Sequence, residues 1–83
     1  MSMIFFTYRA RTQARMGVEV LREAGIPVKL DRTPSNLSQN GCGYGLWVPS
    51  GRGKEAAELL RQQERSYMRS YHMENGAARE VRL

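Results

Sequence analysis

The stretch "LREAGIPVKLD", Leu21 to Asp31, contains the end of a helix and the start of a strand. Gly25 suits the residue after a helix C-terminus, because glycine adopts a left-handed backbone conformation at little steric cost. Pro27 cannot continue a helix, but it is acceptable where a strand begins. From Pro27 to Asp31, apolar residues alternate with polar ones. This alternation predicts a strand with one buried and one solvent-exposed face.

A helix and an earlier strand are predicted before this turn. Residues 9–24 carry Arg and Glu on one arc and an apolar stripe on the other, at helical spacing. The stripe consists of Ala10, Ala14, Val18 and Leu21, widened by Met16, Val20 and Ala24. Met3 to Thr7 contains three consecutive apolar residues, which is typical of a central strand.

A polar loop, a strand and a second helix are predicted after this turn. The loop, 32–43, is long for so small a chain, and long loops are often functional. Tyr44 to Val48 is predicted to be a strand with Gly45 and Trp47 on one face. Ser50 or Gly51 is expected to cap the helix. Its apolar stripe consists of Ala56, Leu59, Leu60 and Gln63.

The last part of the chain fits more than one structure. Residues 66–73 fit either a continued helix or an edge strand, and their alternation favours the strand. Residues 74–83 contain Asn75-Gly76, which suggests a turn followed by a short strand over Glu80 to Leu83, or else a loose tail. We therefore expect a single α+β domain over 1–73 and a C-terminal extension over 74–83.

The predicted order of elements is β-α-β-β-α, followed by a further strand. Two helices on one face of an antiparallel sheet, in this order, form the ferredoxin-like split βαβ sandwich. The sequence thus predicts an α+β, ferredoxin-like fold.

Composition narrows the function classes. The chain has 83 residues, a formal charge of +5 and one cysteine. It contains no apolar run long enough to span a bilayer and no recognisable signal peptide, and a lone cysteine cannot form an internal disulfide. We therefore expect a cytoplasmic protein with no membrane contact. A chain of this size has a small core, which leaves a homodimer open.

The candidate site is Cys42 in the polar loop. Gly41 and Gly43 remove the Cβ atoms on either side of it, which permits positive φ and exposes backbone N–H groups that can converge on an anion. Ser38 and Asn40 add uncharged donors. The thiolate is the reactive form of cysteine, and nearby donors or arginines favour it. The alternative is a structural cysteine that acts as a small hydrophobic residue.

Other site chemistries find no support in the sequence. His72 is the sole histidine, and one cysteine with one histidine is too few for a structural zinc site. No phosphate-loop signature follows the glycines, because a strand is predicted there instead of a helix. We expect no metal and no cofactor.

The stretch "REAGIPVKLDRTPSNLSQNGCGYGLWV" resembles the selenium/sulfur (Se/S) carrier protein-like family of small domains. The likeness covers roughly Met3 to Tyr71 and includes an "AGI-P-V" turn, then "P-x-x-L-S", then "C-G". The matching residues are Ala24, Gly25, Ile26, Pro27, Val28, Pro34, Leu37, Ser38, Cys42 and Gly43.

The resemblance implies that Cys42 holds a persulfide or perselenide and passes it from a donor protein to an acceptor protein. Such a protein is a carrier with a covalent intermediate and not a stand-alone enzyme. Sulfur carriers with a Cys-Pro-x-Pro turn place their cysteine at a helix N-terminus, whereas here Gly43 and a predicted strand follow it.

Two alternatives remain open. A non-enzymatic binding or regulatory module of the same fold would tolerate Cys42→Ser. The basic charge also fits a small RNA-binding domain that uses the sheet face, with binding that weakens in salt and depends on Trp47 or Tyr67. No RNA-binding signature accompanies the charge, so this alternative is the weaker one.

Overall fold

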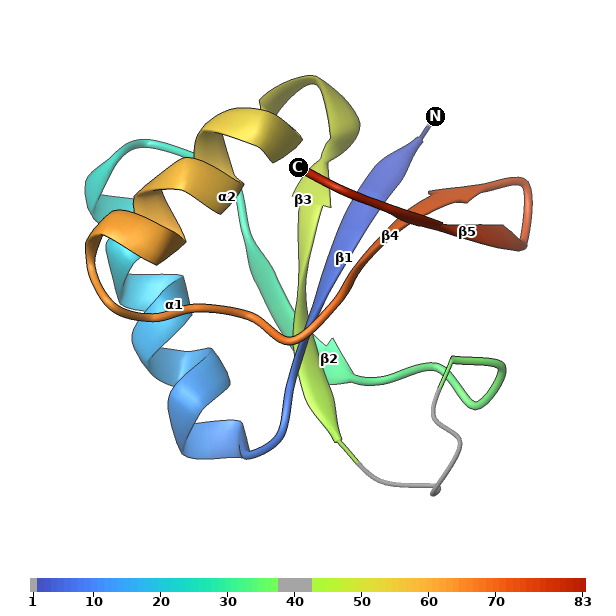
Figure 1. The fold of residues 1–83 in the computed structure, drawn as a ribbon, viewed down its shortest axis with the longest axis horizontal. Coiled ribbons are helices and arrows are strands. Elements are labelled where there is room, and N and C mark those ends of the chain that lie inside the picture. Colours follow the sequence, from blue (N-terminus) through green and yellow to red (C-terminus); the bar gives the residue numbers. More distant parts are fainter. Residues whose placement is uncertain (1, 38–42) are drawn as a thin grey trace.

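The computed structural model describes residues 2–37 and 43–83. Within these residues the chain forms two layers, a five-stranded sheet with two helices on one face (Figure 1). The elements in chain order are β1 (Met3–Tyr8), α1 (Arg11–Glu23), β2 (Lys29–Arg32), β3 (Tyr44–Pro49), the 3-10 turn η1 (Ser50–Arg52), α2 (Gly53–Gln62), β4 (Ser70–Glu74) and β5 (Ala77–Val81).

The sheet has the strand order β2-β3-β1-β4-β5, and each neighbouring pair is antiparallel. The first four strands with the two helices have the order of a ferredoxin-like split βαβ fold, to which β5 adds an edge strand. The predicted α+β class and ferredoxin-like arrangement are therefore confirmed. β1 is central, so both of its edges are hydrogen-bonded within the sheet.

The main core lies between the sheet and the helices. Alternate residues of β1 point into it, and the buried stripes of α1 and α2 cover them. Burial of a Leu or Phe side chain contributes roughly 1.5–3 kcal/mol. The core residues are Ile4, Phe6, Tyr8, Ala14, Val18, Leu21, Ile26, Leu46, Val48, Ala56, Ala57 and Leu60.

The end of α1 follows from the sequence at the helix-to-strand turn. Gly25 has φ +77, and the N–H of Ile26 donates to the carbonyl of Leu21 at 2.9 Å. The N–H of Gly25 donates to the carbonyl of Arg22 at 3.0 Å, which completes a Schellman motif. Ile26 and Leu21 are both buried, so the turn is also held by the core.

Several predictions about the helices were wrong, including the assignment of Ala24 and Gln63 to the apolar stripes, since both residues are exposed. Met16 does not widen the buried stripe of α1, because its side chain is 44% exposed. Gly17, beside it, is buried instead, and the phenol oxygen of Tyr8 lies 3.0 Å from where a Cβ would be. Neither Ser50 nor Gly51 caps α2, because both belong to η1, and Arg52 is the N-cap residue. The Ser50 hydroxyl lies 2.6 Å from that of Ser2 instead.

The C-terminal residues complete the sheet. Residues 70–74 form β4, so the strand alternative is confirmed from Ser70 onward. Asn75 and Gly76 both have positive φ and form the turn, after which β5 pairs with β4. β5 begins at Ala77, three residues earlier than the sequence predicted. Over the described residues, neither helix is long and apolar enough to cross a bilayer.

Candidate functional site

Most of the predicted site falls on residues that the structure leaves undescribed. Ser38, Asn40, Gly41 and Cys42 lie outside the described residues, whereas Gly43 is described. The geometry of the site is therefore built from the residues that hold the two ends of the loop between β2 and β3.

Backbone contacts hold the two ends of this loop together. Arg32 and Tyr44 are the last paired residues of β2 and β3. Just beyond them, the N–H of Thr33 donates to the carbonyl of Gly43 at 3.1 Å. Gly43 has φ +128, and a Cβ there would lie 3.2 Å from the hydroxyl oxygen of Thr33. Both the backbone conformation and the close neighbour disfavour a side chain at this position.

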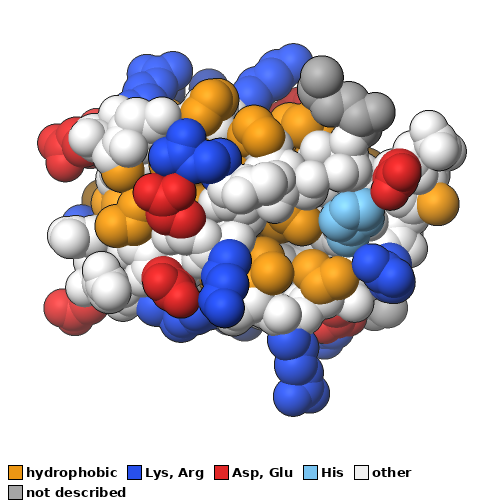
Figure 2. All heavy atoms as spheres, turned by 90° about the horizontal axis from the view of Figure 1, so that it is seen from above, with side chains coloured by type: hydrophobic (Ala, Val, Ile, Leu, Met, Phe, Trp, Pro, Cys, Tyr) orange, Lys and Arg blue, Asp and Glu red, His pale blue; other side chains and the backbone are white. Residues whose placement is uncertain are grey.

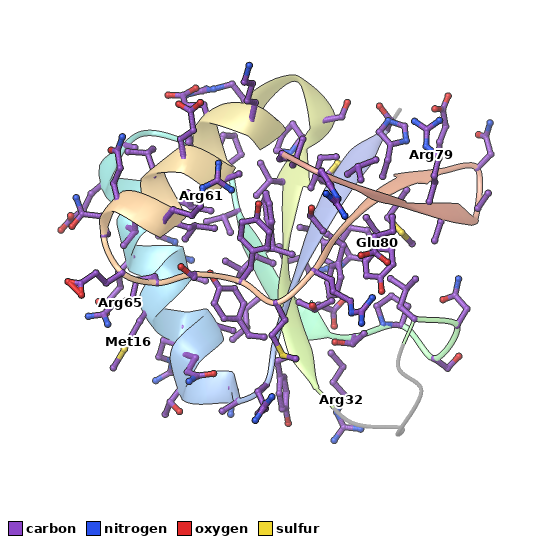
Figure 3. The ribbon with its side chains drawn as sticks, viewed as in Figure 1. Met16, Arg32, Arg61, Arg65, Arg79 and Glu80 are labelled. Atoms are coloured by element: carbon purple, nitrogen blue, oxygen red, sulfur yellow. The ribbon has the colours of Figure 1, made fainter. Side chains whose placement is uncertain are left out.

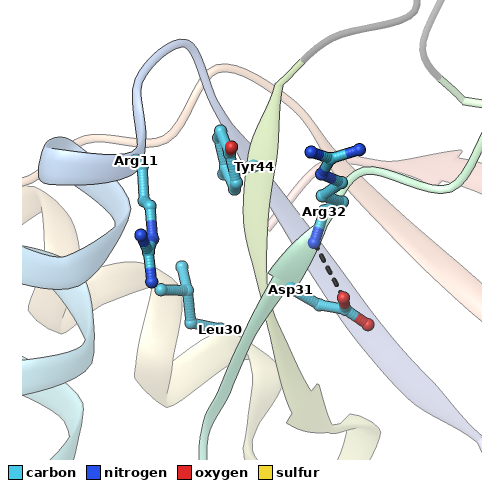
Figure 4. Close-up of a pocket in the computed structure, with 5 residues that line it drawn as sticks. All are labelled: Arg11, Leu30, Asp31, Arg32 and Tyr44. Carbon is cyan, nitrogen blue, oxygen red and sulfur yellow. Dashed lines mark hydrogen bonds between the residues drawn. The ribbon is translucent and has the colours of Figure 1, made fainter.

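A pocket lies where the loop leaves the sheet (Figure 4). It is open, measures about 310 Å³ and is lined by Arg11, Leu30, Asp31, Arg32 and Tyr44. The Asp31 carboxylate is already engaged, because its Oδ1 accepts the Arg32 N–H at 2.8 Å and its Oδ2 accepts the Trp47 indole N–H at 3.2 Å. Both donors, a backbone N–H and an indole N–H, are neutral, so Asp31 keeps its negative charge, and the two arginines outweigh it in the pocket lining.

The arginines at this end of the molecule form no ion pairs with the acidic residues. All eight Asp and Glu residues are within the described ranges, and the ion pairs seen there are Arg52–Glu55 and Arg69–Glu80. Arg9, Arg11 and Arg32 are exposed and belong to neither pair. Figure 3 places Arg32 at the end where the loop leaves the sheet, away from Arg61 and Arg79.

The start of α1 adds to this positive character. Its N-cap is Ala10, which has no side chain able to accept a backbone N–H, and its first turn contains no acidic residue. Arg11 is the first residue of the helix, at the positive end of the helix dipole. A cation in that position costs roughly 0.3–1 kcal/mol instead of stabilising the helix. The local sequence therefore builds up positive charge where helix stability alone would favour an acid.

Tyr8, the last residue of β1, has a structural role. The Tyr8 hydroxyl donates to the Arg65 carbonyl and sits between the sheet and α1. Burial, and then the nearby Tyr67, raise the pKa of Tyr8 far above its ordinary value, although Arg65 opposes this shift. Tyr8 therefore stays protonated near neutral pH and serves as a hydrogen-bond donor.

The aromatic residues named for RNA binding lie on opposite faces of the sheet. Trp47 packs on Phe5, with ring centroids 4.7 Å apart, on the face that no described helix covers. Tyr67 packs on Phe6 on the helix side, with ring centroids also 4.7 Å apart. Trp47 and Tyr67 therefore cannot form one stacking surface. His72 lies half-buried on β4, and Figure 2 shows it at the surface of the end opposite the loop.

The part of the chain that the structure describes contains no set of side chains that could bind a metal ion. Among residues 2–37 and 43–83, no three His, Cys, Asp or Glu side chains gather closely enough to hold an ion.

A family model described as "Putative Se/S carrier protein-like" matches residues 3–72. The chain belongs to this family. The family name suggests that members work with proteins that donate or accept selenium or sulfur. No curated protein and no solved structure matches the chain. The matched region ends within β4, so β5 lies beyond it.

Sequence reasoning singled out the loop but missed the arginines beside it. Arg11 and Arg32 are 21 positions apart, and only the sheet brings them to one pocket. One signal was available, since "RAR" at positions 9–11 puts cations where an acidic first turn is usual. The position of Arg32 at the loop boundary was a second signal, but it required the strand pairing to be interpreted.

Proposed function

We propose that this protein carries sulfur, or its selenium analogue, on the side chain of Cys42. The observation that carries the proposal is the family match, which spans the whole region around the sole cysteine of the chain. Cys42 directly precedes Gly43, the residue whose carbonyl is held by Thr33. The Thr33–Gly43 hydrogen bond thus holds in place the residue that follows the proposed carrier cysteine.

The proposed step is transpersulfidation. The Cys42 thiolate attacks the terminal sulfur of a donor persulfide, R–S–SH, and forms a new S–S bond. The S–S bond of the donor breaks, and its electron pair leaves on the donor sulfur, which takes up the proton. The same exchange with an acceptor thiolate then returns Cys42 to the thiolate. No external oxidant or reductant is consumed, because sulfur moves at a constant oxidation state.

The described residues contribute charge and access to this step. Arg11 and Arg32 line the pocket beside the loop and favour anions, and both the thiolate and a persulfide are anions near neutral pH. The thiol must stay free, as the reducing cytoplasm maintains it. We therefore place the protein in the cytoplasm as a carrier that works between two other proteins and needs no cofactor.

The test is intact mass after incubation of the full chain with inorganic polysulfide as the sulfur donor. We expect the wild type to gain the mass of one sulfur atom and to lose it when excess glutathione is added as the acceptor. Cys42→Ser is the matched control, and it should gain nothing while retaining the wild-type circular dichroism spectrum.

Two results would contradict the proposal. A wild-type thiol that stays unmodified under these conditions would indicate a structural cysteine. Equal modification of wild type and Cys42→Ser would show that the sulfur resides elsewhere. Either result would favour the alternative, a non-enzymatic binding module of the same fold.

A further inference from the structure

The end of the molecule where the loop leaves the sheet presents one continuous surface, which we call the loop-end patch. It consists of Arg9, Arg11, Arg32, Tyr44 and Met68. The arginines are exposed, Tyr44 is half-buried, and the Met68 side chain is 55% exposed. The patch thus combines three cations with an apolar side chain in contact with water.

Strand pairing brings these residues together. Tyr44 pairs with Arg32 on one side and with Tyr8 on the other, and Arg9 follows Tyr8 directly. The N–H of Met68 donates to the carbonyl of Thr7 at 2.8 Å, which sets Met68 beside the same end of β1.

Arg11 is on α1 and belongs to the patch because it lines the same pocket as Arg32 and Tyr44 (Figure 4). The patch therefore runs from β2 across β3 and β1 to the segment before β4.

The patch gathers three arginines at one end of the molecule, although most of the other basic residues also lie outside the two ion pairs. Its three arginines have no ion-pair partner among the acidic residues, all of which are described. At the opposite end of the molecule, basic and acidic side chains are interspersed (Figure 2). Arg11 also sits where the dipole of α1 disfavours a cation. Because folding does not require this positive charge, the three arginines are available to bind a partner.

We propose that the loop-end patch docks an acidic protein segment with at least one apolar side chain, supplied by the protein that gives or takes the sulfur. This inference rests on the proposed carrier function and adds to it the place and the chemistry of the partner. The arginines would pair with carboxylates in a planar, two-point geometry. Met68 would contact the apolar side chain, since its flexible thioether adapts to varied surfaces.

A protein segment fits the patch better than a nucleic acid. Stacking platforms for single strands need exposed aromatic rings, and the one aromatic residue of the patch, Tyr44, also packs against the main core. Met68 has a large exposed hydrophobic side chain, which would contribute nothing to contacts with phosphate groups. The patch also lies directly at the loop that bears the proposed sulfur site, where a partner protein must come close.

The test is a binding titration of the full chain with a fluorescein-labelled peptide composed of Glu and Leu, followed by fluorescence anisotropy. We expect saturable binding at low salt that weakens as NaCl is raised. The double variant Arg11→Glu/Arg32→Glu should bind about tenfold more weakly or worse, because it replaces attraction by repulsion. Met68→Ser should also bind more weakly, but with an unchanged salt dependence.

The matched control is Lys54→Glu/Arg79→Glu. It makes the same change in net charge, with one substitution in the first turn of α2 and one on β5, away from the patch. We expect it to bind within about twofold of the wild type. Equal loss in both double variants would show that only net charge matters, and this would overturn the assignment of the patch.

Two further arms separate this proposal from its alternatives. Cys42→Ser should bind the peptide like the wild type, so docking can be scored even if sulfur transfer fails. A labelled single-stranded RNA tests the other class of partner. If the RNA binds more tightly than the peptide and loses affinity in the Arg11/Arg32 variant, the patch is a nucleic-acid surface and the proposal is wrong. Absence of peptide binding at low salt would also overturn it.

Discussion

At the scale of single residues, Gly45 shows how a missing side chain shapes the sheet. Gly45 faces away from the helices, on the same side as Trp47, as the alternation along this strand predicted. The Phe5 ring fills the space above it, and Phe5 is fully buried although no described helix covers that face. The sequence could not predict this contact, because it joins two strands that are 40 positions apart.

The substitution Gly45→Ala should therefore be strongly destabilising. A Cβ there would lie 2.6 Å from Phe5 Cε2 and would also overlap the carbonyl oxygen of Phe6, which is backbone and cannot rotate away. Overpacking of this kind costs about 1–3 kcal/mol, and sometimes more. Urea unfolding followed by circular dichroism would measure the loss. Gly51→Ala is the control, since nothing lies within 4 Å of its Cβ position, and it should change the unfolding free energy by less than about 0.5 kcal/mol.

At the same scale, Met16 and Ser50 show which residues the sequence could not place. The sequence prediction assigned Met16 to the buried stripe, but the buried residues of α1 are Ala14, Gly17, Val18 and Leu21, and Met16 remains exposed. Ser50 was a good cap by residue type, yet its hydroxyl pairs with Ser2, 48 positions away. Local patterns predict element type well, but they cannot choose between a local and a distant partner.

At the scale of elements, β5 raises the question of where the domain ends. Besides its pairing with β4 and the Arg69–Glu80 ion pair, two hydrogen bonds tie this end of the chain to the rest of the fold: the Ser70 hydroxyl donates to the Val81 carbonyl at 2.8 Å, and Arg61 donates to the Leu83 carbonyl at 2.9 Å. Val81 and Leu83 also pack against the main core. The family match nevertheless ends at residue 72, before this strand. We propose that residues 1–73 form the domain and that 74–83 are an extension that stabilises it.

Removal of residues 74–83 tests that proposal. The shortened chain should still unfold cooperatively, but with a free energy of unfolding lower by roughly 2–4 kcal/mol, from lost apolar burial and the unpaired hydroxyl of Ser70. Thermal and urea unfolding of both chains would measure this difference. In the full chain, Arg82→Ala should have little effect, because Arg82 is exposed. A shortened chain with no cooperative transition would show that β5 belongs to the domain.

The elements also show why most of the fold could be predicted. The Gly-Ile-Pro turn and two stretches of alternation predicted the bounds of α1, β2 and β3 to within two residues at each end. These signals depend only on residues a few positions apart in the sequence. β5 was set three residues too late, since its start depends on the register against β4 and not on its own composition. The glycines flanking Cys42 were visible in the sequence, whereas Arg32 became a neighbour of Arg11 only through the fold.

At the scale of the whole molecule, the distribution of charge bears on both stability and the docking proposed above. The formal charge is +5, and three unpaired arginines gather at one end. Mutual repulsion and the dipole of α1 both act against this arrangement. An acid at position 11 would interact favourably with this dipole. The arginine there is consistent with the docking role proposed for the loop-end patch.

Arg11→Glu should therefore stabilise the fold while weakening peptide binding. An acid at the first residue of α1 would interact favourably with the helix dipole and relieve repulsion from Arg9 and Arg32, for a gain of about 0.3–1 kcal/mol in the free energy of unfolding. Arg11→Gln should give about half of that gain, and 1 M NaCl should reduce both. Urea unfolding and anisotropy titrations on the same samples would measure the two effects. A variant that binds less because it is partly unfolded would be less stable, so opposite signs would exclude that explanation. If Arg11→Glu lowers stability, then Arg11 has a structural role, and weaker binding by this variant would no longer support the patch.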